Sequence, residues 1–460
     1  MSFIDNFICN SPFLIREVMV NMYGYYLSKK RFNREFYVYY RALLKNLEKT
    51  ESEIREEQFE MLKLNLINAY ENIPYYNKIF NETEFSPYKI GGFDDIKIIP
   101  FLDKDKVKNN YNILLNQNIK KSSYIQSCTS GTTGQKTKFL LPKKLAYAKN
   151  AAFIYRFYAM ADISPMDKRV TIGGRRFTNK KPYWIYNIFE NQMLLSTHHL
   201  NEETVDIYIS KINDFNPKFI QGHPNSILYL AIKIINKNIS ITDSIKVIFT
   251  TGETLVEENR RYIERAFKVK VLQQYGSGES CFSAQETSES IGYMMNYEHG
   301  YVELIGNGGV KEVVATSLQN HVMPFIRYKI GDYVVPVKEE IKKRKYQLPY
   351  LFSHVIGRVD DMIVNANGIM VFPVTIREIM KRNMKDFTAY QFLQNNVKDY
   401  ELRLIDEKKD INVDAVVKNL KEILGANSYI NVTYVDRIIS DGGKIRNIIN
   451  KNKEMTLLGL

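Results

Sequence analysis

A short segment rich in hydroxyl side chains and glycine carries the strongest chemical signal in the sequence. In order, it contains Thr129, Ser130, Gly131, Thr132, Thr133 and Gly134. Glycines let backbone N–H groups turn toward an anion, and short hydroxyl side chains donate hydrogen bonds without adding bulk. The segment does not match the P-loop pattern, which needs Gly, four residues and then Gly-Lys-Ser/Thr. We therefore expect a phosphate-binding loop of another kind, with a polar surface turn as the alternative.

The elements that must position this loop follow an α/β pattern. Short apolar runs at 246–249, 270–272 and 313–315 alternate with helix-like segments at 225–236 and 257–266. Gly-rich turns follow several of these runs. Such alternation is typical of an α/β domain with a largely parallel sheet.

Length and periodicity predict more than one domain. A chain of 460 residues is too long for one ordinary core. Residues 1–120 indicate mainly helix packed on the large domain, 121–359 the α/β core, and 360–460 a small α+β domain. In the first region, the helical spacing over 56–80 breaks at Pro74.

The cysteines indicate a reducing compartment. Cys9, Cys128 and Cys281 are widely spaced and odd in number, which argues against disulfides and against a structural zinc site. The start of the chain shows no basic leader followed by an uninterrupted apolar run. Cytoplasmic location is therefore the default expectation.

The net charge of +13 limits the kinds of partner. Basic residues are scattered, with short clusters at 29–31 and 342–345, and no nucleic-acid-binding module accompanies them. We expect no nucleic-acid partner, and anionic small substrates or a solvated surface instead. The apolar stretch 13–27 is interrupted by Arg16, Glu17 and Asn21, which favours a packed or interfacial helix over a membrane span. Peripheral association of residues 1–40 with an anionic membrane stays open.

Five further segments, taken with the 129–134 loop, carry a resemblance to a known family. They lie in order at 250–253, 275–279, 327–332, 357–361 and 443–444. Together the six resemble the motifs of the adenylate-forming superfamily of acyl-CoA synthetases and ligases. The segments 72–76 and 313–328 are most similar to the phenylacetate–coenzyme A ligase family, and 221–231 resembles its capsule-biosynthesis branch. The resemblance covers about residues 55–450.

The resemblance implies an enzyme with a large α/β N-terminal domain and a small mobile C-terminal domain. Its expected reaction joins a carboxylic acid to ATP as an acyl-AMP with release of pyrophosphate, then transfers the acyl group to an acceptor. ATP and Mg²⁺ are the implied cofactors, and coenzyme A is the first-choice acceptor. An amine acceptor, in amide formation to an amino sugar or amino acid for surface polysaccharide, stays open. A non-catalytic nucleotide-binding descendant is the third alternative, because Asp441-Gly442 precedes the lysine motif where Pro and Ser/Thr are commoner.

The resemblance also implies residue roles. Lys444 is the expected catalytic lysine, Glu279 the Mg²⁺ ligand, Tyr275 the residue that stacks on adenine, and Asp332 the acceptor for the ribose hydroxyls. Arg358 marks the interdomain hinge. The implied nucleotide-binding set is Thr129, Ser130, Gly131, Thr132, Thr133, Gly134, Gly252, Glu253, Tyr275, Gly276, Ser277, Asp332 and Arg358.

The acid pocket is expected near Gly174, Arg175, Gly222 and His223. Arg175 or its neighbour could bind a second anionic group of the substrate, with a surface position as the alternative. The pair at 198–199 is not expected to bind zinc, because no spaced cysteine or carboxylate accompanies it.

Overall fold

The computed structural model describes residues 8–128, 137–174, 177–289, 292–337, 344–358, 362–367, 370–371, 373–383, 389–405, 411–435, 438 and 447–451. The chain divides into a large unit of residues 1–330 and 336–354 and a small unit of residues 331–335 and 355–460. This division rests on compactness alone, and the domain boundary near residue 360 stays a prediction.

The chain begins with helices whose ends follow from local sequence. They are α2 (Phe13–Arg31), α3 (Arg34–Lys45), α4 (Glu51–Asn72), α5 (Pro74–Glu82) and α6 (Lys104–Asn109). A capping box between Thr50 and Glu53 starts α4. Pro74 cannot continue that helix and occupies the first turn of α5, so the predicted break is confirmed. Between 83 and 120 the helical structure is limited to α6 and short 3₁₀ turns, because Pro87, Pro100 and 91–92 (Gly-Gly) interrupt the chain.

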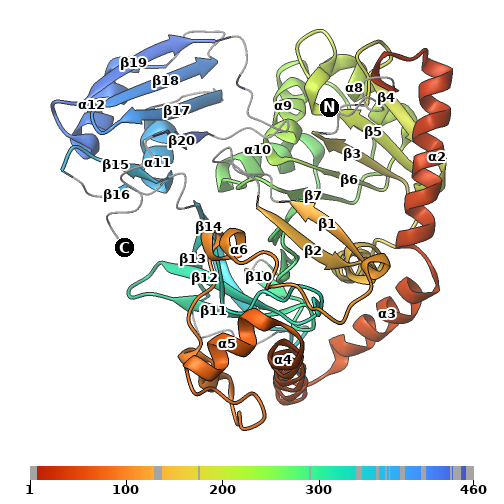
Figure 1. Ribbon diagram of the computed structural model, residues 1–460. Helices are drawn as coiled ribbons and strands as arrows, with labels where there is room; N and C mark the ends of the chain where they lie inside the picture. Colours follow the sequence, from red (N-terminus) through yellow and green to blue (C-terminus); the bar gives the residue numbers. More distant parts are fainter. Residues whose placement is uncertain are drawn as a thin grey trace. The chain divides into compact units, whose positions relative to one another are not determined.

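A twelve-stranded sheet forms the centre of the large unit among the described residues, in the order β11-β12-β13-β14-β10-β9-β8-β7-β6-β3-β5-β4 (Figure 1). Its strands are β3 (Arg169–Gly173), β4 (Trp184–Asn187), β5 (Gln192–Ser196), β6 (Phe219–Gly222), β7 (Val247–Thr251), β8 (Lys270–Gly276), β9 (Ser283–Glu286), β10 (Tyr293–Met295), β11 (Gly300–Ile305), β12 (Lys311–Ser317), β13 (Tyr328–Pro336) and β14 (Tyr350–Arg358). A separate antiparallel ribbon pairs β1 (Tyr124–Cys128) with β2 (Lys138–Pro142).

The two halves of the large sheet differ in strand direction. Strands β5, β3, β6, β7 and β8 are parallel. Three helices connect strands of this half, namely α8 (Val205–Phe215), α9 (Pro224–Asn236) and α10 (Glu257–Phe267). Beyond β8 the pairs β8–β9, β9–β10, β10–β14 and β11–β12 are antiparallel.

The expectation of a largely parallel sheet therefore holds for the first half only. In the second half short Gly-rich turns, such as the one at 306–309, join successive strands. A short turn can close only an antiparallel pair, whereas a parallel pair needs a crossover.

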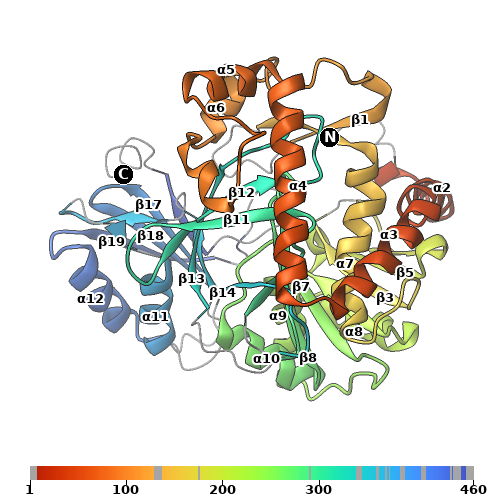
Figure 2. The ribbon, with the colours of Figure 1, turned by 90° about the horizontal axis from the view of Figure 1, so that it is seen from below.

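Helix α4 covers the β11–β12 side of the sheet (Figure 2). The side-chain amide of Gln58 donates to the carbonyl of Gly300 at 2.8 Å, and that of Asn65 donates to the carbonyl of Ser317 at 2.8 Å. Farther along the chain, α7 (Asn150–Ala159) contacts α3. These contacts make the helical start of the chain part of the large unit.

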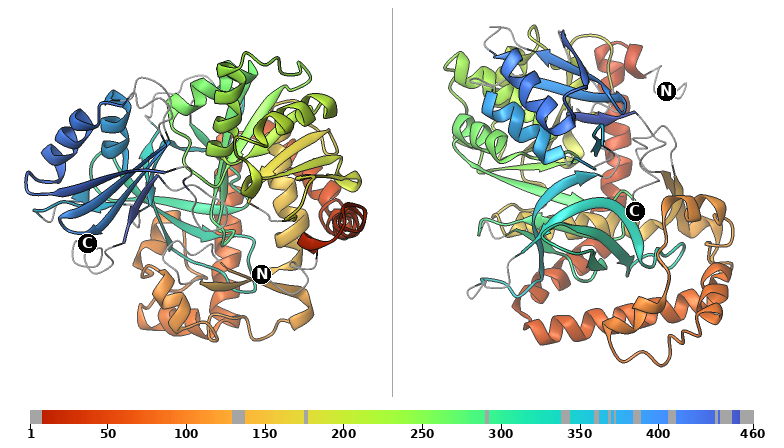
Figure 3. Two further views of the ribbon diagram at one scale, coloured as in Figure 1. Left: turned by 90° about the horizontal axis from the view of Figure 1, so that it is seen from above. Right: turned by 90° about the vertical axis from the view of Figure 1, so that its left-hand side faces the viewer.

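The small unit is an α+β sandwich. Its sheet has the order β19-β18-β17-β20, and α11 and α12 lie on one face of it (Figure 3). The elements are β15 (Ile363–Val364), β16 (Met370–Val371), α11 (Pro373–Asn383), β17 (Ala389–Asn396), β18 (Asp399–Ile405), α12 (Val413–Leu424), β19 (Tyr429–Tyr434) and β20 (Ile448–Asn450). Tyr400, Leu402 and Leu404 alternate along β18 and face the two helices in the core, as period-2 spacing predicts.

Among the described residues, no helix combines the length and the apolar character needed to cross a membrane.

Candidate active site at the carboxyl edge of the parallel strands

Four adjacent parallel strands bring many of the predicted residues to one edge. In the register, Ile172 of β3 pairs with Gly222 of β6, which pairs with Thr250 of β7. Thr251 then pairs with Gln274 of β8. Because neighbouring parallel strands end at the same edge of a sheet, the residues that follow them gather there, where open α/β sheets bind ligands. The residues gathered in this way are Gly174, Gly222, His223, Gly252, Glu253, Tyr275, Gly276 and Ser277.

Gly222 fills a position where the strands approach closely. A Cβ atom added there would lie 2.7 Å from the carbonyl oxygen of Ile172 and 3.3 Å from a methyl carbon of Ile227. A backbone oxygen cannot yield as a flexible side chain can, so any larger residue would push β6 away from β3. Glycine at 222 therefore fixes where the following residue, His223, leaves the strand.

His223 and Glu253 tie together the segments that follow β6 and β7. The Nδ1 atom of His223 lies 3.0 Å from the carbonyl oxygen of Thr251. A carbonyl only accepts, so Nδ1 is the donor. The carboxylate of Glu253 accepts from the side-chain amide of Asn225 at 2.9 Å and from its backbone N–H at 3.3 Å. Asn225 lies in the first turn of α9, where a negative charge is favourable.

The turn between β8 and β9 presents an aromatic ring, exposed glycines and a buried carboxylate. Tyr275 is half-buried, and its ring packs edge-on against Phe352 with centroids 5.2 Å apart. Gly276 and Gly278 are exposed. Glu279 is buried, and its Oε1 accepts a hydrogen bond from the hydroxyl of Tyr328 at 2.9 Å. The turn thus offers open backbone beside a carboxylate of fixed orientation.

His299 supports this turn from beneath. Its Nε2 lies 3.1 Å from the carbonyl oxygen of Ser280, and its Nδ1 lies 2.9 Å from the hydroxyl of Ser283. The ring stacks on Phe153 with centroids 4.4 Å apart. Burial lowers the pKa of His299 to about 3, and the positive charge of Arg156 adds to the effect, so the imidazole is neutral at pH 7.

His198 holds the segment after β3. The Nε2 of His198 lies 2.9 Å from the carbonyl oxygen of Gly174, so it donates to that loop. Its neighbour His199 bonds the carbonyl oxygen of Thr178 at 2.7 Å and stacks on Tyr183. Both rings therefore use a nitrogen to hold loop backbone. Within the part of the chain that is described, no three His, Cys, Asp or Glu residues gather so that they could hold a metal ion.

The other predicted residues are placed as follows. Asp332 is buried in β13. It follows Gly331, whose φ of +82° favours glycine. Residues 331–335 belong to the small unit. Arg358 is the last residue of β14. The loop residues Thr129, Ser130, Gly131, Thr132, Thr133 and Gly134, together with Arg175 and Lys444, lie outside the described residues.

No sequence pattern indicated that His299 or the hydroxyl of Tyr328 contacts these loops. A single histidine in a strand-like or loop-like run has no spacing that marks it. Tyr328 lies within the segment identified at 327–332, but nothing in that segment shows that its hydroxyl reaches Glu279.

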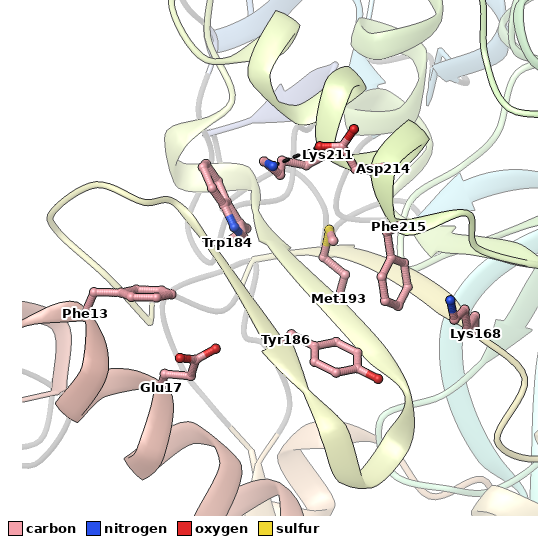
Figure 4. Close-up of a pocket in the computed structure, with 9 residues that line it drawn as sticks. All are labelled: Phe13, Glu17, Lys168, Trp184, Tyr186, Met193, Lys211, Asp214 and Phe215. Atoms are coloured by element: carbon pink, nitrogen blue, oxygen red, sulfur yellow. Dashed lines mark hydrogen bonds and ion pairs between the residues drawn. The ribbon is translucent and has the colours of Figure 1, made fainter.

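A groove of about 450 Å³ lies elsewhere in the large unit (Figure 4). Phe13 of α2, Trp184 and Tyr186 of β4 and Lys211 of α8 line it. Lys168, which also lines it, directly precedes β3, so the groove lies toward the amino ends of the parallel strands. Of the predicted site residues that the structure describes, none borders it, and the groove is therefore treated apart from the candidate site.

Comparisons of the sequence point to one enzyme family. The chain is 28% identical to Protein CapK of Staphylococcus aureus, over 97% of this chain and 100% of that protein. It is 23% identical to the phenylacetate-coenzyme A ligase of Pseudomonas putida, over 89% of this chain and 97% of that one. A phenylacetate-coenzyme A ligase of Aromatoleum evansii is 25% identical over 80% of this chain and 84% of its own. No protein-family model matches the chain.

Comparisons of the structure agree on the fold. A 2-hydroxyisobutyryl-CoA ligase in the postadenylation state, in complex with R3-HIB-AMP, matches with a TM-score of 0.67 at 15% identity, over 89% of this chain and 92% of that one. An open conformation of 2-hydroxyisobutyryl-CoA ligase, in complex with 2-HIB-AMP and CoA, matches with a TM-score of 0.56 at 16% identity, over 87% and 92%. The predicted fold class, a large α/β domain with a C-terminal α+β domain, is confirmed.

Proposed function

The chain belongs to the adenylate-forming superfamily, in the phenylacetate–coenzyme A ligase family, and from this we propose that it converts a carboxylic acid and ATP to an acyl-AMP and passes the acyl group to coenzyme A. The observation that carries the proposal is the gathering of the 250–253 and 275–279 segments at the carboxyl edge of adjacent parallel strands. That edge is the ligand-binding edge of an open α/β sheet.

In the adenylation step, a carboxylate oxygen attacks the α-phosphorus of ATP. A bond forms between that oxygen and phosphorus, and the bond to the pyrophosphate oxygen breaks. Two anions must approach each other, so the site must supply positive charge and hydrogen-bond donors. We assign the positive charge to Lys444 and the donors to the 129–134 loop, on the strength of the motifs.

The β8–β9 turn supplies the nucleotide contacts in this proposal. Tyr275 provides a ring held edge-on by Phe352, which suits stacking on adenine. The exposed backbone around Gly276 and Gly278 lets a ligand approach closely. Asp332 is assigned to the ribose hydroxyls, because a short carboxylate accepts hydrogen bonds from both.

Glu279 fits the requirements of Mg²⁺ in a nucleotide site. Mg²⁺ there is held by one or two carboxylates together with phosphate oxygens, so a single fixed carboxylate suffices. The hydrogen bond from Tyr328 holds Oε1 of Glu279 in one direction. When bound with ATP, the ion neutralises charge that develops on the phosphates.

The thioester step needs only an acceptor thiol. The sulfur of coenzyme A attacks the acyl carbon, a C–S bond forms, and AMP leaves with the electrons of the broken C–O bond. The acid itself stays unidentified, and the acid pocket is assigned to the neighbourhood of Gly174, Gly222 and His223.

A second candidate acceptor is an amine. The whole-length match to CapK and the resemblance of 221–231 to the capsule-biosynthesis branch favour it. In that reaction the nitrogen of an amino sugar or amino acid would attack the acyl carbon of the same acyl-AMP. A C–N bond would form, AMP would leave with the electrons of the broken C–O bond, and the nitrogen would lose a proton to solvent.

The test is acid-dependent ATP–pyrophosphate exchange over a panel of aryl, sugar and amino acids, followed by addition of coenzyme A or an amine. We expect at least one acid to support exchange, and Lys444→Ala to lower the rate by ~10²-fold or more, the scale of a lost transition-state charge contact. Lys398→Ala, at an exposed turn between β17 and β18, is the matched control. Tight ATP binding without exchange for any acid would instead support a non-catalytic descendant.

A further inference from the structure

Helix α2 exposes an apolar face to solvent. Leu14, Val18 and Met22 follow one another at intervals of four residues, so they lie on one side of the helix. Their exposed fractions are 73%, 57% and 68%. Ile15, Tyr25 and Tyr26 flank them, each 49% exposed. We call these six residues the α2 face.

The opposite side of α2 is fixed to the protein, so the helix cannot rotate to bury this face. Arg16 is fully buried and donates to the carbonyl of Pro182 at 2.9 Å, with a further bond to Thr178. The side chain of Asn21 donates to the carbonyl of Tyr186 and accepts from the N–H of Ile188, both at 2.9 Å.

The packing of Gly24 gives the same orientation. A Cβ atom at this position would lie 2.4 Å from the side-chain oxygen of Asn187, so glycine lets the helix approach closely without displacing that side chain. Figure 1 shows α2 along the outer side of the β4 end of the sheet. The fixed side thus faces the sheet, and the apolar face is directed outward.

Basic residues flank the α2 face, and none of its residues is acidic. Its C-terminal end carries Lys29, Lys30 and Arg31, followed by the exposed Arg34 of α3. The ammonium groups of Lys29 and Lys30 lie over the rings of Tyr25 and Tyr26, at 5.5 and 4.3 Å. The first turns of α3 add exposed Tyr37 and Val38, at 40% and 62%. Aliphatic, then aromatic, then basic side chains thus follow one another over a helix length of about 22 Å from Leu14 to Lys29.

We propose that α2 docks this protein on an anionic lipid surface, with the α2 face in the acyl–headgroup boundary and its lysines on the headgroups. An amphipathic helix with apolar and aromatic residues on one side and cations beside them binds in this manner. The net charge of +13 favours an anionic partner over a second copy of the same chain, which would bring like charges together. This inference does not depend on the acid or on the acceptor in the proposed function.

The test is flotation of the full chain with vesicles of phosphatidylcholine alone or mixed with phosphatidylglycerol. We expect binding to the mixed vesicles and loss of binding at high salt. The double variant Val18→Glu/Met22→Glu places charges on the α2 face, and we expect ~10²-fold weaker binding. The matched control is Leu64→Glu/Ile98→Glu, at apolar positions 65% and 55% exposed on other elements.

A third variant tests the electrostatic part. Replacement of Lys29 and Lys30 by Gln should weaken binding roughly fivefold per lysine on mixed vesicles and change little on neutral ones. Arg31 is left in place, because it pairs with Glu190 at 3.1 Å. Circular dichroism and urea unfolding check that each variant is folded.

The outcomes separate lipid from protein partners. Equal vesicle binding by Val18→Glu/Met22→Glu and by its control would overturn the proposal. The proposal would also be overturned if the protein formed a dimer without vesicles and the Val18→Glu/Met22→Glu variant dissociated that dimer. The α2 face would then join two copies of the chain. Failure of exchange alone would refute the proposed function and leave the membrane inference standing.

Discussion

The neutral, buried imidazole of His299 predicts that the large unit loses stability as pH falls below 6.5. The pKa of this histidine is lowered from 6.5 to about 3 by burial. Between these two pKa values, His299 is therefore neutral in the folded state and protonated in the unfolded state. Stability is fully present above the unfolded pKa and is lost progressively as pH falls toward the folded pKa.

The size of the effect follows from one proton. Each pH unit between the two pKa values is worth about 1.4 kcal/mol, so lowering the pH from 7 to 5 should remove about 2 kcal/mol through this group alone. Other titrating groups add their own contributions. Comparison with a variant that cannot titrate at this position isolates that of His299.

The assay is urea unfolding of the protein and of His299→Gln at several pH values. Trp184 is the only tryptophan and lies in β4, so its fluorescence reports the large unit. At pH 7 we expect the variant to be less stable by about 1–3 kcal/mol, because it leaves hydrogen-bonding groups of Ser280 and Ser283 unsatisfied. That difference should shrink by about 2 kcal/mol at pH 5. A difference that stays constant from pH 7 to pH 5 would refute the reasoning.

Three further substitutions test separate contacts. Gly222→Ala should destabilise the large unit by about 1–3 kcal/mol, because its Cβ would overlap a neighbouring strand; an unchanged melting temperature would contradict this. Tyr328→Phe removes the donor to Glu279, and we expect roughly tenfold more Mg²⁺ for half-maximal exchange; an unchanged Mg²⁺ requirement would remove Glu279 from the metal site. Glu298→Gln breaks a buried ion pair with Arg156 at 2.7 Å and should cost about 3–5 kcal/mol in urea unfolding, more than removing both charges with Arg156→Met/Glu298→Leu.

Local periodicity determined most of the elements. The break at Pro74 appears between α4 and α5, and the helix-like 257–266 lies in α10. The apolar run 270–272 lies in β8. These features depend on residues close in sequence, so the repeat of 3.6 or 2.0 residues is sufficient to find them.

The sequence predicted where strands form but only partly whether neighbouring strands are parallel or antiparallel. Apolar runs such as 313–315 predicted a strand, and β12 forms there. They could not predict that it pairs antiparallel to β11, whereas β7 and β8 are parallel. Pairing depends on the length of the connection and on competition among distant strands, and the period of a single run contains neither.

For helix α2, too, the sequence predicted the element but not which of its sides faces the protein. From the sequence, Arg16, Glu17 and Asn21 interrupt an apolar stretch and favour a packed or interfacial helix over a membrane span. In the structure Arg16 and Asn21 are the residues that hold the helix to the protein, so the apolar residues are the ones left exposed. Polarity alone would place the side chains of Arg16 and Asn21 on the exposed side of the helix. Their hydrogen-bond partners in the large unit hold them on the packed side instead.

The sequence by itself indicated the family resemblance, the order of the motifs that carry it and the residue types that the chemistry needs. The tertiary structure decided which of those residues meet and what supports them. It brought Gly222, Gly252 and Tyr275 to one edge because β6, β7 and β8 are parallel neighbours. It also placed His299 under the Glu279 turn, a contact between a turn and a residue about 20 positions away. A motif is a set of residues close in sequence, so its spacing can be recognised from the sequence alone. A supporting contact joins residues that are distant in sequence and has no such spacing.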